Sequence, residues 1–506
     1  MQKLTKGQIG ILLVVYVALL AAWFHQISES SIHDDALGTL IPAVNLVHDG
    51  VYSLDDEPPL APTMYREPVP ILLTSIAVVV VDAIMGPAEL PAYMSGERAR
   101  LIKFQNVLWL TLLCTAAFLA TLYFTSSFPL ATGTAVLSYL AFLYPAVRDV
   151  GVDSLYTEMP AAGLLLLSSW LLASSISGRN WPRLVAAGVC FGLLSLTKAM
   201  ALPVFLGTLI VVVLYRAVRP AGTELRTTLA QTAVLLVSCV IVVAPWVYRN
   251  WTVFHSTQIS ERGGLSVYMR ALYNEVSPTE YRGLFYIWAP SPIRTPVGRI
   301  LGFSSRDLKP GGALMRLTAD EDARYAKSDL QAQRDGRPDR AVSLVAKARA
   351  ERVKVRNEVR VAGYGHRTNV VADDLMKDRG MAMMKEQPGK TIAGAVTGLW
   401  RGAILILPLL AWAVLHAWRH RREDVLIFCV PALGFTFLLS MFSVFEPRYS
   451  GPMTPLAFVA AAVAASGFAR YRRNSALLAP KQEGPSTKGR PDRFVEQLES
   501  APPAIR

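Results

Sequence analysis

Residues 155–176 read LYTEMPAAGLLLLSSWLLASSI, in which an acidic residue stands at the head of a long apolar run. A helix of about 20 predominantly apolar residues spans the hydrocarbon core of a bilayer, and this run is of that length. Nine further segments of the same kind occur along the 506 residues. We predict spans near 8–25, 102–124, 129–148, 155–176, 183–199, 201–217, 227–247, 394–417, 424–444 and 452–470. With 52% hydrophobic and 18% charged residues and a mean hydropathy of +0.33, the composition predicts an all-α polytopic membrane protein.

Short basic loops predict the orientation of the spans. Arginines cluster in the connections after residues 176, 217, 417 and 470, and short basic loops stay in the cytoplasm. Both termini are then cytoplasmic, and residues 26–101, 149–154, 248–393 and 445–451 lie on the outer face. The net charge of +13 is explained by this orientation, so a nucleic-acid partner is not expected. The Pro-, Ser- and Lys-containing tail, 472–506, is predicted to be a disordered cytoplasmic extension.

Two stretches of the outer loops have helical patterns. Residues 70–85 are apolar, but counting them as an eleventh span would place the basic loops outside, so we predict an interfacial or re-entrant helix. Residues 317–359 are rich in Ala, Glu, Lys, Arg and Leu, with Gly336 and Pro338 between two halves, which predicts two surface helices. A solvated helical cover is the simplest interpretation of that pair.

Acidic residues gather near the outer ends of the spans. Asp34 and Asp35 follow the first span at the start of an expected helix, and Glu158 begins the fourth span. A carboxylate there can accept a proton from an acceptor hydroxyl. Each is also a favourable residue for the first turn of a helix. Two acidic sites at equal membrane depth favour a catalytic role for these carboxylates over a role in helix capping.

Basic residues occupy the same edge. Lys198 ends the fifth span, Arg249 follows the seventh, Arg448 and Tyr449 follow the ninth, and Arg66 with Glu67 precedes the interfacial helix. Lys and Arg at helix ends often extend to the membrane surface without further function. Their convergence with carboxylates on one face predicts a site for a phosphate-bearing substrate.

In their order and spacing these motifs resemble those of the polytopic glycosyltransferases with the GT-C fold. The resemblance is to the bacterial relatives of dolichyl-phosphate-mannose protein mannosyltransferases and of the aminoarabinose transferase that acts on lipid A. It covers residues 8–250 well and the last three spans moderately. It implies a catalytic module at 1–250, an outer loop domain at 251–393 and C-terminal spans at 394–471. Family members often have Asp-Glu where this chain has Asp34 and Asp35, which leaves open which carboxylate is the base.

The resemblance implies transfer of a sugar, with inversion, from a polyprenyl-phosphate donor to a lipid, glycan or protein acceptor. The enzyme would lie in the bacterial inner membrane, with its active site on the periplasmic or extracellular face. Asp34 is the expected base, and Glu158 orients a substrate or helps to hold a metal. The group Arg66, Lys198, Arg249 and Arg448, with Glu67 and Tyr449, would bind the donor phosphate. Some relatives use a divalent metal at the first-loop carboxylates, but this chain has no dense ligand cluster, so the requirement for a metal is left open.

Two other functions fit part of the pattern. A transporter or lipid flippase would place ionisable residues near the bilayer midplane within repeats, whereas these charges lie at helix ends and the chain contains no visible repeat. A polysaccharide polymerase or ligase would also use outer-face basic residues and polyprenyl-linked glycans, and the loop at 251–390 is large enough to carry its site. The identities of the sugar and the acceptor do not follow from these residues.

Overall fold

The computed structural model describes residues 4–142, 151–176, 180–218, 225–309, 311–318 and 323–478. All regular elements in these ranges are helices, which confirms the predicted fold class. The helices are α1 (Lys6–Phe24), α2 (Leu37–His48), α3 (Pro68–Met85), α4 (Pro91–Met94), α5 (Gly96–Lys103), α6 (Asn106–Thr125), α7 (Phe128–Ala141), α9 (Glu158–Ile176), α10 (Trp181–Ser195), α11 (Ala201–Val218), α12 (Leu225–Phe254), α13 (Gly263–Leu272), α14 (Pro278–Ile287), α15 (Ser291–Leu301), α16 (Ala323–Asp335), α17 (Leu344–Val361), α18 (Thr368–Glu386), α19 (Pro388–Ala403), α20 (Ile406–Arg419), α21 (Glu423–Phe442) and α22 (Thr454–Leu478).

The long apolar helices form a bundle around α9. This helix is buried along nearly its whole length and packs against α6, α10 and α21. Its neighbour α10 lies close to α12 because Gly188 and Gly192 face that helix. A Cβ added at Gly188 would lie 2.6 Å from the carbonyl oxygen of Leu235, so only glycine permits this approach. Small residues are the usual means by which membrane helices pack closely.

The described residues do not confirm the predicted count of ten spans. Within the described residues, seven helices are long and apolar enough to cross a membrane, or eight if one bent pair is a single span. Three further apolar helices, α7, α10 and Thr454–Ala469, are shorter. The predicted span at 129–148 ends in residues outside the described part of the chain.

The predicted span at 394–417 is not one helix. It comprises α19 and α20, which meet at an angle of 96°. Pro408, in the first turn of α20, explains the break, because a proline cannot donate to the carbonyl four residues earlier and its ring collides with that carbonyl. The helix therefore ends near Ile404 and restarts in a new direction.

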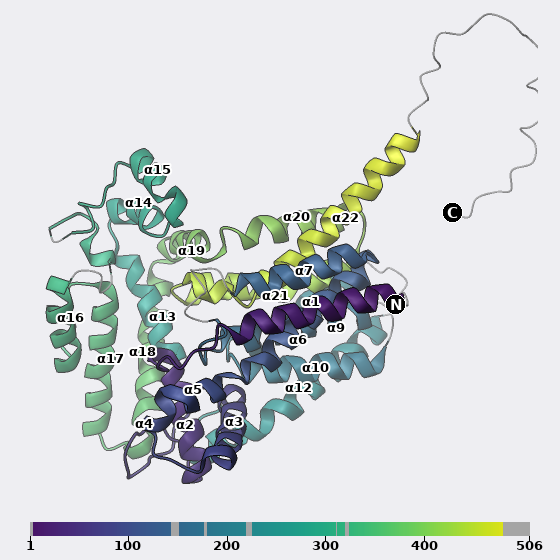
Figure 1. The fold of residues 1–506 in the computed structure, drawn as a ribbon. Helices are drawn as coiled ribbons and strands as arrows, with labels where there is room; N and C mark the ends of the chain where they lie inside the picture. Colours follow the sequence, from purple (N-terminus) through teal and green to yellow (C-terminus); the bar gives the residue numbers. More distant parts are fainter. Residues whose placement is uncertain are drawn as a thin grey trace, which may run out of the picture.

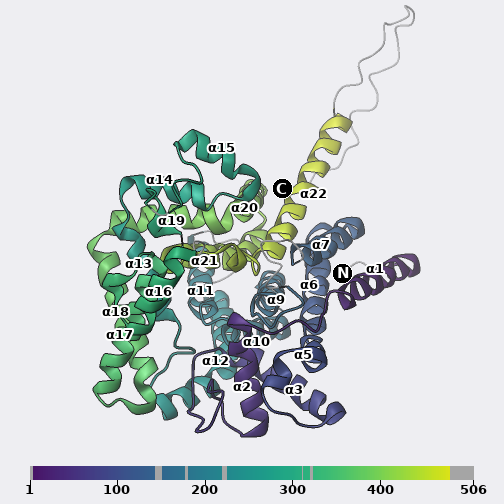
Figure 2. The ribbon, with the colours of Figure 1, turned by 60° about the vertical axis from the view of Figure 1, so that its left-hand side comes forward.

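Two groups of helices cover one end of the bundle, where the outer loops were predicted. Helices α2 to α5 form one group and α13 to α18 form the other (Figures 1 and 2). The two predicted surface helices are present as α16 and α17, separated by the short turn Pro338–Arg340. They pack on each other, and α17 also packs on α13 and α18. The polar termini of the spans thus meet a helical layer rather than open loops.

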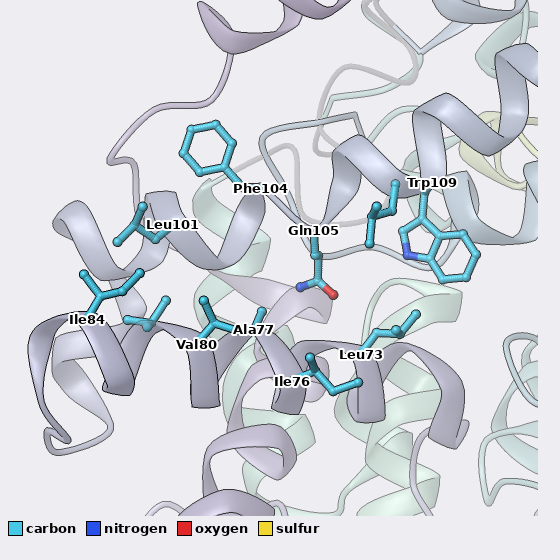
Figure 3. A pocket seen from close by; sticks show the side chains of 11 residues that line it. Leu73, Ile76, Ala77, Val80, Ile84, Leu101, Phe104, Gln105 and Trp109 are labelled. Carbon is cyan, nitrogen blue, oxygen red and sulfur yellow. The ribbon is translucent and has the colours of Figure 1, made fainter.

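Helix α3 matches the segment predicted to be interfacial, although its length and composition would also suffice for a span. It lies with α2, α4 and α5 at the end of the bundle. An apolar groove of about 330 Å³ separates α3 from α5 and α6, and Figure 3 shows its side chains. At its centre Gln105 hydrogen-bonds to the Thr74 hydroxyl, with Nε2 3.0 Å from Oγ1. Ile76 and Leu108 on the rim are more than half exposed, as suits side chains that face lipid.

Helix α22 runs on to Leu478, beyond the start of the predicted tail at 472. Residues 479–506 of that tail lie outside the described residues. The predicted disorder therefore stays a prediction for this segment.

Candidate active site

Asp35 is the centre of a cluster of charges at the end of the bundle. Oδ1 of Asp35 lies 2.7 Å from Nη2 of Arg66 and 3.2 Å from Nη2 of Arg262. Its Oδ2 lies 3.0 Å from Nη2 of Arg448. Three arginines from three separate loops thus share one carboxylate.

The two first-loop aspartates occupy different environments. Asp34 has a φ of +53°, a left-handed conformation that Asp tolerates better than most residues, and the turn it makes begins the 3-10 helix Asp34–Ala36. The Asp34 side chain is 79% exposed and its nearest charged partner is His33 at 3.8 Å, whereas the Asp35 side chain is 26% exposed. The structure therefore places Asp35, and not the expected base Asp34, among the arginines.

Positive charge dominates the electrostatics of Asp35. Burial acts to raise its pKa, but the three guanidinium groups outweigh burial and hold the pKa well below its ordinary value. Burial acts to lower the pKa of Arg448, but Tyr449 and the neighbouring carboxylates raise it above its ordinary value. Both groups are therefore charged over the whole physiological range of pH.

Arg66 and Glu67 hold the first loop in place. Arg66 also donates to the backbone carbonyl oxygen of Asp35, at 2.6 Å. A Cβ on Gly38 would lie 2.7 Å from Nε of Arg66, so the absence of a side chain at that position makes room for the guanidinium. Glu67 accepts a hydrogen bond from the backbone N–H of Ala199 at 3.1 Å and from the Ser260 hydroxyl at 3.2 Å. Glu67 is thus a link between three loops, and its charge also acts on Arg262 of the cluster.

Glu158 and Lys198 form a second, deeper pair. Nζ of Lys198 lies 3.0 Å from Oε1 of Glu158, whose side chain is only 4% exposed. The other carboxylate oxygen, Oε2, is buried and has no hydrogen-bond partner. Lys198 also lies over the ring of Tyr449, 5.4 Å from its centre, and Arg448 lies 5.1 Å from the centre of the same ring. Tyr449 therefore connects this pair to the Asp35 cluster.

Arg249 lies elsewhere. Its guanidinium donates to the carbonyl oxygen of Thr63 at 2.8 Å and is surrounded by the rings of Tyr52, Trp246 and Phe254, each within 5.3 Å. These contacts engage Nη1 and the faces of the guanidinium with protein atoms. Arg249 thus supports the loop that carries Arg66 and is not grouped with the other predicted phosphate ligands.

A cavity of about 970 Å³ opens beside the cluster. Its lining includes Asp35, Arg448 and Tyr449, together with residues that sequence reasoning missed: Tyr65, Glu261, Arg262, Arg349, Arg352, Arg356 and Arg360. Arg262 lies immediately before α13, in a loop domain that carries many arginines, so no local pattern distinguishes it. The four arginines of α17 lie in the helix pair that the sequence predicted to be a solvated cover.

The charges at the site do not suit a divalent cation. Both oxygens of Asp35 already face guanidinium groups, and a cation would have to displace at least two positive charges to reach them. Among the residues that the structure describes, no three His, Cys, Asp or Glu side chains are grouped to hold a metal. The arrangement instead suits an anion, because arginines bind phosphate oxygens with paired, charge-assisted hydrogen bonds.

Neither a protein-family model nor a curated protein matches the chain. Among solved structures, it is similar to the oligosaccharyltransferase of Archaeoglobus fulgidus tethered with an acceptor peptide, with a TM-score of 0.43, 15% identity, and coverage of 92% of this chain and 50% of that one. It is also similar to ArnT of Cupriavidus metallidurans bound to undecaprenyl phosphate, with a TM-score of 0.36, 15% identity, and coverage of 92% and 79%.

These neighbours are GT-C fold glycosyltransferases, the group that the sequence resembles. The chain spans about half the length of the oligosaccharyltransferase. At these identities the likeness concerns the fold, so the chemistry of this chain has to follow from its own side chains.

Proposed function

We propose that this chain is a membrane glycosyltransferase that moves a sugar from a polyprenyl-phosphate donor to an acceptor hydroxyl, with inversion, on the outer face of the bacterial inner membrane. The observation that carries the proposal is the convergence of Arg66, Arg262 and Arg448 on Asp35 beside a large cavity at one end of apolar helices. This place suits a substrate with its lipid tail in the membrane and its phosphate at the surface.

The donor phosphate would bind to the arginines. A phosphate that takes hydrogen bonds from Arg262 and Arg448 competes with Asp35 for these two guanidinium groups. Their positive charge holds the pKa of Asp35 low, so sharing it with the negative charge of the donor phosphodiester raises that pKa toward its ordinary value. Donor binding thereby turns a neutralised carboxylate into a better proton acceptor.

In the transfer step the bond between the anomeric carbon and the phosphate oxygen breaks, and the phosphate keeps the electron pair. The acceptor oxygen forms the new bond to the anomeric carbon from the opposite side, and its proton passes to a carboxylate oxygen of Asp35. The sugar passes through a state with oxocarbenium character, as in glycoside hydrolysis. Stabilising the departing phosphate is the task of the arginines, and Lys198 adds charge through its place beside Tyr449.

Glu158 would orient a hydroxyl of the sugar or the acceptor. Its Oε2 is buried without a partner, which is costly unless a substrate group fills that position. Asp34, exposed at the rim, is not part of this mechanism. No metal is assigned a step.

The test is a transfer assay with purified full-length protein in lipid nanodiscs. Radiolabelled polyprenyl-phosphate monosaccharides are incubated with a membrane acceptor fraction, and label in the acceptor is counted. Wild type is compared with Asp35→Asn and with the matched control Asp49→Asn, which alters an exposed aspartate of the same loop. Transfer by wild type and Asp49→Asn but not by Asp35→Asn supports the proposal. Absence of transfer from every donor by folded wild-type protein would overturn it.

A polymerase or ligase is the second candidate, because the cavity is larger than one sugar needs and its far wall is basic. Such an enzyme would transfer a whole oligosaccharide from a polyprenyl-linked carrier. The same assay with labelled polyprenyl-pyrophosphate oligosaccharides distinguishes the two, since only the polymerase or ligase would transfer the whole labelled oligosaccharide to the acceptor.

A further inference from the structure

The basic face of α17 forms the far wall of the cavity. Arg349, Arg352, Arg356 and Arg360 line it, at intervals of three and four residues that place them on one side of a helix. At about 1.5 Å per residue this row of arginines is about 16 Å long. It is therefore far longer than one phosphate group.

The acids of α17 are not paired with Arg352, Arg356 or Arg360. Glu351 and Glu358 both pair with Arg379 of α18, on another side of the helix. Two buried acids, Glu261 and Asp373, interact with Arg352. Burial and the neighbouring Asp373 raise the pKa of Glu261 to about 7 against the effect of Arg352, so only about half of its charge is present at neutral pH.

The charges of the row act on one another. Burial and the neighbouring charges of Arg360 and Arg352 lower the pKa of Arg356 below its ordinary value. Nε of Arg356 is also buried without a hydrogen-bond partner. A row of like charges at this spacing is unfavourable in the free protein, and a bound polyanion would relieve it.

The row on α17 meets the donor site at Tyr65, because Arg352 of the row and Arg262 of the cluster lie 5.6 Å and 5.0 Å from the centre of that ring. In Figure 1 the helix lies across the direction of the long apolar helices, on the side of α13 and α18 away from the bundle. A phosphate carried by a membrane lipid meets Arg66, Arg262 and Arg448 on the bundle side. The wall formed by α17 is left for the second substrate.

We infer that the acceptor is an anionic glycan whose phosphate or carboxylate groups bind along Arg349, Arg352, Arg356 and Arg360. The inference rests on the proposed function in one respect, which is that it takes the second substrate to be the sugar acceptor. A glycan segment suits the volume of about 970 Å³, which lies within the range of small-ligand sites and is too small for a folded protein.

The test is direct binding to the full-length protein in nanodiscs of neutral lipid, without donor. The probes are tetragalacturonic acid, the neutral tetrasaccharide maltotetraose and the acidic peptide hexaglutamate, measured by calorimetry at low and at physiological salt. The variant Arg356→Gln/Arg360→Gln removes two charges from the row. Lys354→Gln is the matched control, because Lys354 is exposed on α17 outside the cavity lining.

We expect tetragalacturonate to bind wild type and Lys354→Gln alike, to bind the double variant about tenfold more weakly, and to lose affinity with salt. Equal binding of maltotetraose, no binding of any probe, or equal weakening by Lys354→Gln would overturn the inference. Tighter binding of hexaglutamate than of tetragalacturonate would also overturn it and assign the row to an acidic polypeptide. If the double variant does not fold, Arg360→Gln alone, at an exposed position, gives the same comparison with about threefold weakening.

This experiment is independent of catalysis. Loss of the anionic-glycan binding with intact sugar transfer would remove the acceptor inference and leave the proposed function. Intact binding without transfer from any donor would remove the proposed function and leave the anion site.

Discussion

Nη2 of Arg448 lies 3.0 Å from Oδ2 of Asp35, so the loop before the last helix closes against the loop after the first. Arg66 and Arg262 meet the other oxygen of the same carboxylate. Asp35 thus holds three cations in position while the donor is absent, and a donor phosphate is the natural competitor for them. Because Asp35 contacts these guanidinium groups and Asp34 does not, variants of the two aspartates should have different effects.

Asp35→Asn is expected to lower the rate of sugar transfer by about 10²–10⁴-fold, because a general base contributes a factor of that size. Asp34→Asn is expected to retain most of the rate, since its side chain is largely exposed and outside the arginine cluster. Initial rates of label transfer with purified variants measure both effects. The reverse result, with Asp34→Asn inactive and Asp35→Asn active, would return the base role to Asp34.

Arg448→Ala is expected to raise the donor KM about tenfold to a hundredfold, as loss of a charge-assisted hydrogen bond to phosphate predicts. It also leaves Glu446 and Asp35 with fewer partners, so thermal unfolding is measured alongside. The control is Arg299→Ala, an exposed arginine of α15. An unchanged donor KM in folded Arg448→Ala would remove Arg448 from the phosphate site.

The charges at the ends of spans were predictable from sequence. Arg66, Glu158, Lys198 and Arg448 interrupt or flank apolar runs, where any charge is conspicuous. Arg262 and the arginines of α17 were missed because they lie in a loop domain with 24 basic residues between 251 and 390, where composition singles out none of them. What selects them is the packing of α17 on α13 and α18, a long-range contact with no local signal.

The same distinction explains why Arg249 lies apart from the arginine cluster and why the predicted span at 394–417 is bent. Arg249 has the helix-end position of a phosphate ligand, but the ring of Tyr52 and the rings of Trp246 and Phe254 from its own helix, α12, surround it. The span at 394–417 has the hydropathy of one helix, and only the steric effect of Pro408 divides it. Hydropathy predicts which segments are apolar, whereas their direction depends on backbone geometry and packing.

Lys198→Met is expected to destabilise the protein by about 3 kcal/mol, because it leaves the buried carboxylate of Glu158 without its cation. Adding Glu158→Gln should recover much of that stability, since the double variant contains no unpaired charge. Transfer activity should not recover with it. Thermal unfolding and transfer rates are measured for Lys198→Met, Glu158→Gln and the double variant, which together with wild type form a double-mutant cycle. Equal recovery of stability and activity would make the pair purely structural.

Treatment with a chelator is expected to leave the transfer rate unchanged, because guanidinium groups already occupy the positions around Asp35 that a divalent ion would take. The rate is measured after dialysis against EDTA, and again after addition of Mg²⁺, Mn²⁺ or Ca²⁺. Loss of activity on chelation with rescue by one ion would show that the donor or acceptor completes a metal site.

Glu261 makes the stability of the outer helices depend on pH. Burial raises its pKa from an ordinary value of 4.5 to about 7 in the folded protein, with Asp373 acting in the same direction and Arg352 and Arg249 against it. The folded state therefore holds this proton more tightly than the unfolded state does. The stabilisation is fully present below pH 4.5 and is lost as pH rises through about 7. Over that window the loss attributable to Glu261 is up to about 3 kcal/mol.

Glu261→Gln is expected to remove this loss, because glutamine cannot ionise. The variant should unfold at nearly the same temperature at pH 5 and pH 7, whereas wild type should unfold at a lower temperature at pH 7, apart from the contribution of Asp373. The control is an exposed acid of the same domain, Glu358→Gln, which should keep the wild-type slope. If the unfolding temperature of Glu261→Gln falls between pH 5 and pH 7 as much as that of wild type, the pH dependence belongs to Asp373. Burial also raises the pKa of Asp373.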